Sequence, residues 1–293
     1  MSWANAAVQG VLLGGLFALF ATGLSLSFGV MRFVNLAHGD LAILAAYLAV
    51  STTAALNVNP FVSLLVVVPV MAAGGYVLQR FVFDRTIGPD PLPAILVTFG
   101  LGVVIQNALL EHYSADSRGL DAGAIEDRSI RLTDGIAVGW LPLLTLVTAV
   151  AVLIGLQVML SRTRAGRAFR ATADDPDTAR LMGIDDRGVH SRVMAISFAT
   201  VALAGVFLGI RGTFGPAEGT AVLLFGFEAV VIGGLGSLWG TLVGGIILGL
   251  AQALGNQVDV RYDLLSGVLF GHLLFLVVLA FRPQGLFGQR GRT

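Results

Sequence analysis

The chain has 293 residues, of which 56% are hydrophobic and only 12% charged, with zero formal net charge and a mean hydropathy of +0.85. Soluble domains carry about 25% charged residues, so this composition leaves too little polar surface to cover a soluble protein. The chain contains arginine but no lysine and no cysteine. Disulfides, thiol catalysis and a P-loop are therefore excluded, since a P-loop needs a lysine beside the phosphates. If the process that this chain serves uses ATP, the ATPase lies on another polypeptide.

Apolar runs of about 20 residues, the length of a membrane-spanning helix, recur along the chain. The first run is too long for a signal h-region and lacks a basic leader, so we interpret it as a retained helix. For the short segment 220–235 and its successor, a re-entrant hairpin is an alternative. The sequence predicts an all-α polytopic membrane helix bundle of eight or nine transmembrane segments, some interrupted, at about 4–30, 40–57, 60–80, 93–110, 139–160, 193–211, 220–235, 237–255 and 263–281.

Arginines in the connecting segments indicate the orientation, because short cytoplasmic loops are enriched in basic residues. Segment 161–192 contains seven arginines, and the C-terminal tail contributes Arg282, Arg290 and Arg292 without an acid. Segment 111–138 instead contains three arginines and six acids. We therefore expect one membrane domain over 1–293, with a cytoplasmic loop at 161–192, an external loop at 111–138 and a cytoplasmic C-terminus.

Glycines spaced four residues apart recur in the apolar segments. Lipid provides no hydrophobic drive between helices, so small residues favour association by letting backbones approach closely. We expect this helix-packing role for Gly236, Gly240, Gly244, Gly245 and Gly249.

The segment Asn35–Asp40 places polar residues between two apolar runs. Such residues belong at the water boundary or in the bundle interior. One interpretation is a turn in which Gly39 relieves the backbone and Asp40 caps the following helix. The other is an interrupted helix that lines a translocation pathway, with Asn35, His38 and Asp40 facing it. The sequence leaves both interpretations open.

A single acid, Glu228, lies within an otherwise apolar segment. An acid in such a place indicates a functional site, here a further pathway residue. The alternative is that 220–235 does not span the membrane, so that Glu228 is solvated or paired with Arg211. Ser237 and His272 also lie in apolar segments and suggest a hydrolase dyad. Ser237 lies among glycines, however, and is better explained by helix packing.

The cytoplasmic loop carries the signals of one short helix from Asp174 to Ile184. Asp175 is a good N-cap, Pro176 suits the first helical position, and Gly183 suits a left-handed residue after the last turn. A helix this short is marginal alone in water, and its apolar residues have no evident local core. We interpret it as a docking element for another protein. The alternative is an amphipathic turn that lies on lipid head groups.

Together these features resemble the permease subunits of branched-chain amino-acid ABC importers of the LivH type, over residues 5–288. The chain departs from the family at Ala45, where glycine is common, and at Leu238–Thr241, where a proline is common. The matching motifs are Asn35–Gly39 with Ala45–Tyr47, Arg167–Ala171 with Asp174 and Ala179–Ile184, the glycine run Gly233–Gly245, and Arg282–Gly288.

The resemblance implies that 172–184 is a coupling helix that sits in a cleft of an ATPase subunit. The residues that it assigns to coupling are Arg167, Asp174, Asp175, Pro176, Ala179, Leu181, Met182 and Gly183.

We therefore predict a non-catalytic permease subunit of an ATP-driven importer, for branched-chain amino acids, in a bacterial inner membrane. The implied partners are a second homologous permease, two ABC ATPase subunits, an external solute-binding protein and membrane lipid, but no nucleic acid. We expect no cofactor or metal on this chain, because ATP is used by the partner subunits. Relatives of this type also carry urea, short amides and aromatic acids, so the solute stays open. The alternative function is a secondary transporter or channel for a small polar solute, with His38, Asp40 and Glu228 as its relay.

Overall fold

The computed structural model describes residues 2–88, 90–133, 135–262 and 266–288. The predicted tail residues Arg290 and Arg292, and the first three residues of the predicted segment 263–281, lie outside this range. Each of the nine predicted apolar segments corresponds to one helix of the described chain, with ends that differ by a few residues, which confirms the predicted helical membrane fold. They are α1 (Trp3–Met31), α2 (His38–Leu56), α3 (Pro60–Phe81), α4 (Leu92–Tyr113), α5 (Trp140–Arg162), α8 (Asp186–Arg211), α9 (Gly219–Gly233), α10 (Leu238–Tyr262) and α11 (Gly267–Phe281).

Eight helices in the described part of the chain are long and apolar enough to cross a membrane, one of them only when α9 is extended back to Pro216. The last helix, α11, has 15 residues and falls short of this length. Two further helices, α6 (Arg164–Asp174) and α7 (Pro176–Leu181), connect α5 to α8. Short 3-10 turns lie at Phe83–Arg85, Gly123–Ile125 and Pro216–Glu218.

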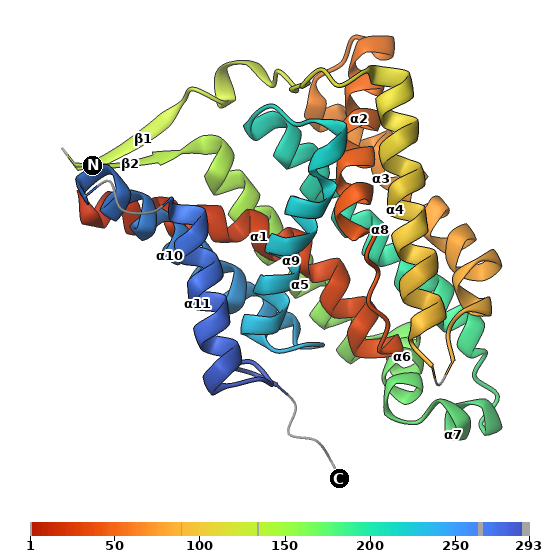
Figure 1. The fold of residues 1–293 in the computed structure, drawn as a ribbon. Helices are drawn as coiled ribbons and strands as arrows, with labels where there is room; N and C mark the ends of the chain where they lie inside the picture. Colours follow the sequence, from red (N-terminus) through yellow and green to blue (C-terminus); the bar gives the residue numbers. More distant parts are fainter. Residues whose placement is uncertain (1, 89, 134, 263–265, 289–293) are drawn as a thin grey trace.

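Helix α1 lies at the centre of the bundle, where it packs against α5, α8, α9 and α10 (Figure 1). Its small residues bring neighbouring backbones into direct contact. A β-carbon at Gly10 would lie 2.7 Å from Cα of Leu250 on α10, and one at Gly15 would lie 2.6 Å from Cα of Leu146 on α5. Only glycine fits at these crossings, so helix approach here depends on the missing side chain.

The predicted packing glycines lie on two faces of α10 and in the turn before it. Gly245 and Gly249 face α1, where a β-carbon at Gly245 would lie 2.8 Å from the carbonyl oxygen of Gly14. Gly240 and Gly244 face α9 instead. Gly236, with a φ of +81°, lies in the α9–α10 turn, where a left-handed backbone favours glycine.

A β-hairpin in the predicted external loop was not expected from the sequence. Strands β1 (Ser129–Thr133) and β2 (Ile136–Gly139) pair antiparallel and lie beside the start of α1 (Figure 1). The amide of Gln9 donates to the carbonyl of Ala137 at 2.7 Å, and the backbone N–H of Ala137 donates to Asn5 at 3.1 Å. The hairpin therefore anchors this loop to α1, while α6 and α7 lie at the opposite end of the bundle.

Gly240→Leu is expected to destabilise the protein by about 3 kcal/mol through overpacking. A β-carbon there would lie 2.9 Å from the carbonyl carbon of Gly233, and neither backbone can retreat without opening the α9–α10 contact. The yield of monodisperse protein in detergent and its thermal unfolding temperature measure the effect. Gly155→Leu is the matched control, because Gly155 lies in α5 with open space around it. Equal yields for the two variants would contradict the packing role of Gly240.

Candidate functional site

Helix α6 packs against the bundle mainly through its one aromatic residue, Phe169. The helix is polar along most of its length, but Phe169 is only 1% exposed and belongs to a buried cluster with Leu26 and Val30 of α1. The Thr163 hydroxyl caps the helix by accepting the backbone N–H of Gly166 at 3.0 Å. The sequence analysis did not identify α6. The signal that was available is one large aromatic residue within an arginine-rich stretch.

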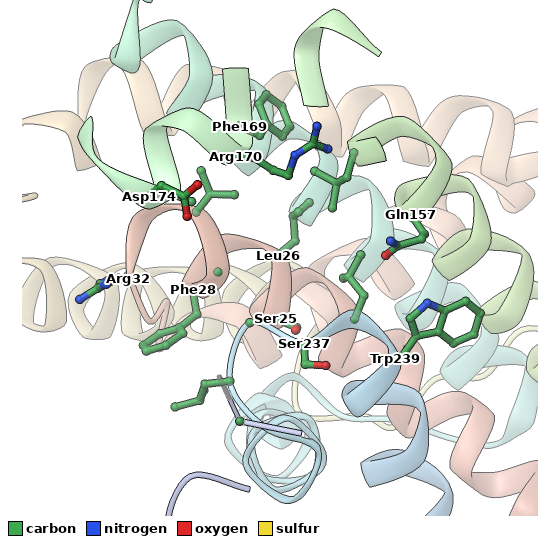
Figure 2. A pocket seen from close by; sticks show the side chains of 18 of the residues that line it. Ser25, Leu26, Phe28, Arg32, Gln157, Phe169, Arg170, Asp174, Ser237 and Trp239 are labelled. Atoms are coloured by element: carbon green, nitrogen blue, oxygen red, sulfur yellow. The ribbon is translucent and has the colours of Figure 1, made fainter. Parts of the chain in front are cut away.

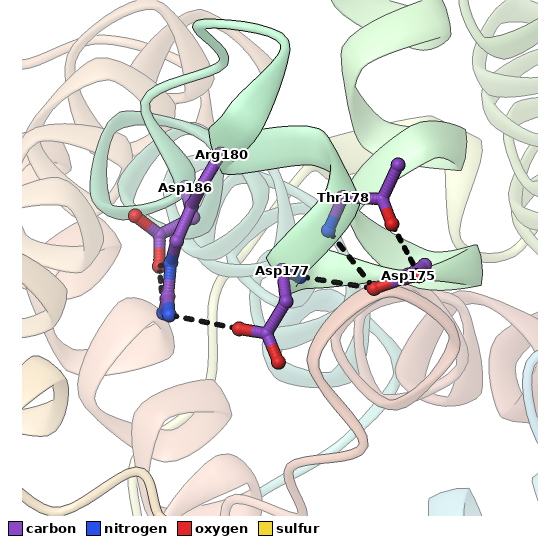
Figure 3. A network of polar contacts seen from close by, with 5 residues as sticks. All are labelled: Asp175, Asp177, Thr178, Arg180 and Asp186. Atoms are coloured by element: carbon purple, nitrogen blue, oxygen red, sulfur yellow. Dashed lines mark hydrogen bonds and ion pairs between the residues drawn. The ribbon is translucent and has the colours of Figure 1, made fainter.

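Helix α7 is short but capped at both ends, and Figure 3 shows the cap at its N-terminus. The Asp175 carboxylate accepts the backbone N–H groups of Asp177 and Thr178 at 3.0 and 3.1 Å, and the Thr178 hydroxyl at 2.6 Å. These hydrogen bonds lower the pKa of Asp175, with the Thr178 hydroxyl as the main cause. Asp175 is therefore ionised at neutral pH, and the cap weakens only as acid protonates it.

The C-terminus of α7 forms a Schellman motif. The N–H of Ile184 donates to the carbonyl of Ala179 at 3.0 Å, and that of Gly183 donates to the carbonyl of Arg180 at 2.9 Å. Gly183 has a φ of +83°, as its predicted position after the helix requires. The predicted N-cap and left-handed glycine are thus both present, and they define a helix of six residues.

The predicted single helix from Asp174 to Ile184 is wrong in its extent. Asp174 is the last residue of α6, and the backbone of Asp175 is extended, so two helices meet at this residue. The reason is Pro176, which disfavours a helical conformation for the residue before it. Of the other residues assigned to coupling, Arg167 is exposed on α6, and Ala179 lies on the buried side of α7.

Two adjacent apolar side chains project from the end of α7 into open space. Leu181 is 87% exposed and Met182 is 79% exposed. Arg180 holds this end of α7 against α8, since its guanidinium donates to Asp186 at 2.6 and 3.0 Å and to Asp177 at 3.2 Å (Figure 3). The fold therefore presents an apolar tip, Leu181 and Met182, on a braced helix at one end of the bundle.

A second group of predicted residues lies where α2 begins. The six residues between α1 and α2 are not helical, yet Phe33, Asn35 and Ala37 in this segment are buried. The side-chain oxygen of Asn35, Oδ1, accepts the backbone N–H of Ala37 at 3.0 Å. This hydrogen bond starts the turn that leads into α2. Gly39 and Asp40 lie inside α2, so the interpretation of Asp40 as the cap of this helix is wrong. The N-cap residue is Ala37, which makes no side-chain cap hydrogen bond. Asn35 instead forms an Asx turn before the helix, because its short side chain reaches the N–H two residues ahead.

His38 and Asp40 face different neighbours. The His38 Nε2 donates to the carbonyl of Phe20 on α1 at 2.8 Å, and Gly23 leaves room for the imidazole. The Asp40 carboxylate lies instead against Gly102 of α4 and Gly219, the first residue of α9. Asp40 thus belongs to the first turn of α2 and adjoins the first turn of α9. A negative charge is favourable at both places, because helix N-termini carry partial positive charge.

Glu228 is buried between α9 and α11, where it pairs with His272. The His272 Nδ1 lies 2.6 Å from Oε1 of Glu228, and Phe225 stacks on the imidazole. The expectation that Glu228 is solvated or paired with Arg211 is therefore wrong. Glu228 is 1% exposed, and its other oxygen, Oε2, has no hydrogen-bond partner among the described residues. Tertiary packing of α11 brings the histidine to the acid from 44 residues away.

These residues form neither the proton or cation relay nor the serine–histidine dyad considered from the sequence. His38 bonds to α1 and Glu228 bonds to α11, and no hydrogen bond or ion pair joins either residue to Asp40 in the described part of the chain. Ser237 accepts the backbone N–H of Gly240 at the start of α10, whereas His272 is bonded to Glu228. The relay and the serine–histidine dyad considered above therefore lack the contacts that they require.

Comparison with known proteins identifies the family. The family model described as branched-chain amino acid transport system / permease component matches residues 6–278. This chain belongs to that family. The permease is 30% identical to the high-affinity branched-chain amino acid transport system permease proteins BraD of Pseudomonas aeruginosa and LivH of Escherichia coli. Each alignment covers 96% of this chain and 94% of the relative.

Among solved structures, PsaBC from Streptococcus pneumoniae in complex with Fab aligns with 98% of the permease and 94% of that chain, at a TM-score of 0.49 and 15% identity.

Family membership makes this chain a multi-pass membrane protein and the non-catalytic permease subunit of an ABC transport system. The family works with ATPase and binding-protein partners, and the ATPase partners hydrolyse the ATP.

His272→Ala is expected to destabilise the permease by about 3 kcal/mol, because it leaves the Glu228 carboxylate buried and unpaired. Replacing both partners, in Glu228→Leu with His272→Leu, is expected to restore most of this loss. Thermal unfolding in detergent measures both effects. Leu273→Ala is the control, since Leu273 is the exposed neighbour on the same helix. A double variant that is no more stable than His272→Ala alone would refute the role of the pair.

Proposed function

We propose that this permease imports branched-chain amino acids in a bacterial inner membrane, as one of two homologous permease subunits. Two ABC ATPase subunits bind at the α6–α7 end, which faces the cytoplasm together with the C-terminus, and an external binding protein delivers the solute at the hairpin end. The whole chain acts as one membrane domain, with 161–192 as its coupling loop and 111–138 outside. The exposed apolar tip, Leu181 and Met182, is the observation that carries this proposal.

A partner subunit that covers Leu181 and Met182 on binding would account for their exposure in the isolated chain. Burying a leucine side chain in a contact contributes about 1.5–3 kcal/mol to the free energy of binding. The same side chain contributes nothing to stability while it stays exposed. The caps at Asp175 and Gly183 support a docking role, because a six-residue helix has little stability of its own. A preformed helix loses less entropy when it binds.

Movement of α7 would reach the interior by two rigid connections. The Arg180–Asp186 ion pair joins α7 to the first turn of α8. Phe169 of α6 packs on Leu26 and Val30, close to the end of α1. Beyond that end lies the buried non-helical segment that leads to α2 and Asp40. ATP-driven closure of the ATPase subunits would thereby displace the residues around Asp40 and alternate the opening of the pathway.

Leu181→Arg is expected to reduce retention of the ATPase subunits by about tenfold or more, because a charge replaces the buried leucine at the contact. Co-purification in detergent measures retention, and ATP-dependent uptake in proteoliposomes is expected to fall with it. Asp175→Ala, which removes the N-cap, is expected to weaken both. Leu56→Arg is the matched control, since Leu56 is an exposed leucine at the end of α2. Full retention by Leu181→Arg would overturn the coupling assignment.

The solute pathway is proposed to pass Asp40, with Asn35 and His38 in the segment beside it and Glu228 further along α9. Asp40 is the partly exposed acid at the meeting of α2, α4 and α9. The ammonium group of an amino acid would pair with this carboxylate as it passes. Tyr47 lies two turns further along α2 and packs against Tyr113 and Phe214, so aromatic side chains flank the route.

Asp40→Asn is expected to lower the rate of leucine uptake by about tenfold or more, through the loss of one charge-assisted hydrogen bond. Retention of the ATPase subunits is expected to stay unchanged, which separates this effect from that of Leu181→Arg. Competition by valine, isoleucine, urea and short amides in proteoliposomes that contain all subunits identifies the solute class. Uptake that is unaffected by Asp40→Asn would exclude this carboxylate from the pathway.

A further inference from the structure

A cavity of about 710 Å³ lies at the α6–α7 end of the bundle, on a different part of the fold from the apolar tip and from Asp40. It is enclosed by the ends of α1 and α5, by α6, by the α9–α10 turn and by the segment that follows α11. Phe169 and Asp174 line it, but none of the roles proposed above places a ligand in it. Its size is that of a small-molecule site.

The lining of the cavity is basic. Arg170 of α6 and Arg32, which follows α1, both line it, and neither arginine has an ion-pair partner in the described part of the chain. Arg170 extends from α6 on the side where Gln157 and Trp239 lie, and Arg32 lies at the opposite side (Figure 2). Among the lining residues that the structure describes, Asp174 is the one acid. The charged lining therefore favours an anion that also offers hydrogen-bond donors.

The floor of the cavity holds a polar atom without a partner. Ser25 is fully buried, and its hydroxyl has no hydrogen-bond partner in the structure. Ser237 lies beside it on the α9–α10 turn (Figure 2). A buried hydroxyl without a partner costs stability. Because Ser25 is 0% exposed, a ligand in the cavity would reach this hydroxyl only if the neighbouring residues shifted.

The side of the cavity toward α5 is continuous with a surface suited to lipid. Val147, Ile154 and Val158 are between 46% and 55% exposed, and their spacing places them on one face of α5. Gln157 and Ser161, which line the cavity, continue this face toward the end of the helix. Trp239 is 46% exposed at the same level, and tryptophan favours the boundary between lipid tails and head groups.

We propose that this cavity binds the head group of an anionic phospholipid of the phosphatidylglycerol type. The guanidinium of Arg170 donates two parallel N–H hydrogen bonds to the phosphate, the bidentate geometry common in arginine–phosphate contacts. The glycerol hydroxyls donate to Asp174, and an acyl chain lies along Val147, Ile154 and Val158. Basic pockets between transmembrane helices are suited to anionic head groups. A bound lipid would join α5 to the start of α10, two helices that make little direct contact here.

The test uses the full-length chain with the subunits that co-purify with it, titrated with phosphatidylglycerol or phosphatidylcholine and examined by native mass spectrometry. We expect one retained phosphatidylglycerol per permease and about fivefold weaker retention in Arg170→Gln, the effect of one basic residue at a membrane surface. Arg170→Lys is expected to keep most of the affinity. Arg164→Gln is the matched control, because Arg164 is an exposed arginine of α6 outside the cavity.

Three outcomes would overturn the proposal. Phosphatidylglycerol would be retained equally by Arg170→Gln and Arg164→Gln, or phosphatidylcholine would bind as tightly as phosphatidylglycerol. Alternatively, inorganic phosphate would displace the lipid, which would show a site for a free anion. The readout is lipid retention, so the result does not depend on the ATPase contact or on uptake.

Discussion

The fold depends on the direct backbone contact of α1 with the helices around it. In lipid, helices gain nothing from hiding apolar surface, so close van der Waals contact must hold the bundle together. Glycines provide this contact at Gly10 and Gly14 of α1, which meet Gly245 and Gly249 of α10. Because α1 packs most extensively against α5, α8, α9 and α10, its position determines theirs, and a side chain at any of these crossings would separate the layers.

The end of α1 connects the apolar tip to the interior. Phe169 fixes α6 to this end of α1, and the chain then turns into the buried segment that contains Asn35. Among the described residues, two buried polar atoms here have no partner: Nδ2 of Asn35 in this segment and Nδ1 of His38 at the start of α2. Most buried polar groups in proteins are paired, so exceptions mark places with a function or a second conformation. A pathway that opens and closes here would use both atoms.

The contact between Glu228 and His272 attaches the short helix α11 to α9. With 15 residues, α11 is about 22 Å long, which is less than the hydrocarbon core of a bilayer. The ion pair with α9 holds its middle, and Asn256 of α10 accepts the backbone N–H of Gly267 at its start. Polar contacts between helices thus compensate for limited apolar length, in a part of the bundle where Gly271 already brings α10 close.

The amino-acid sequence by itself determined the membrane class, the nine helical segments and the ends of α7. These features are local, because they depend on runs of apolar residues, on Asp175 before Pro176, and on Gly183 after the last turn. Only the tertiary structure decided that Glu228 meets His272, that Asp40 lies against α4 and α9, and that Arg170 lines a cavity. Each of these contacts joins residues whose distance in space depends on helix packing, and apolar periodicity carries no information about which faces meet.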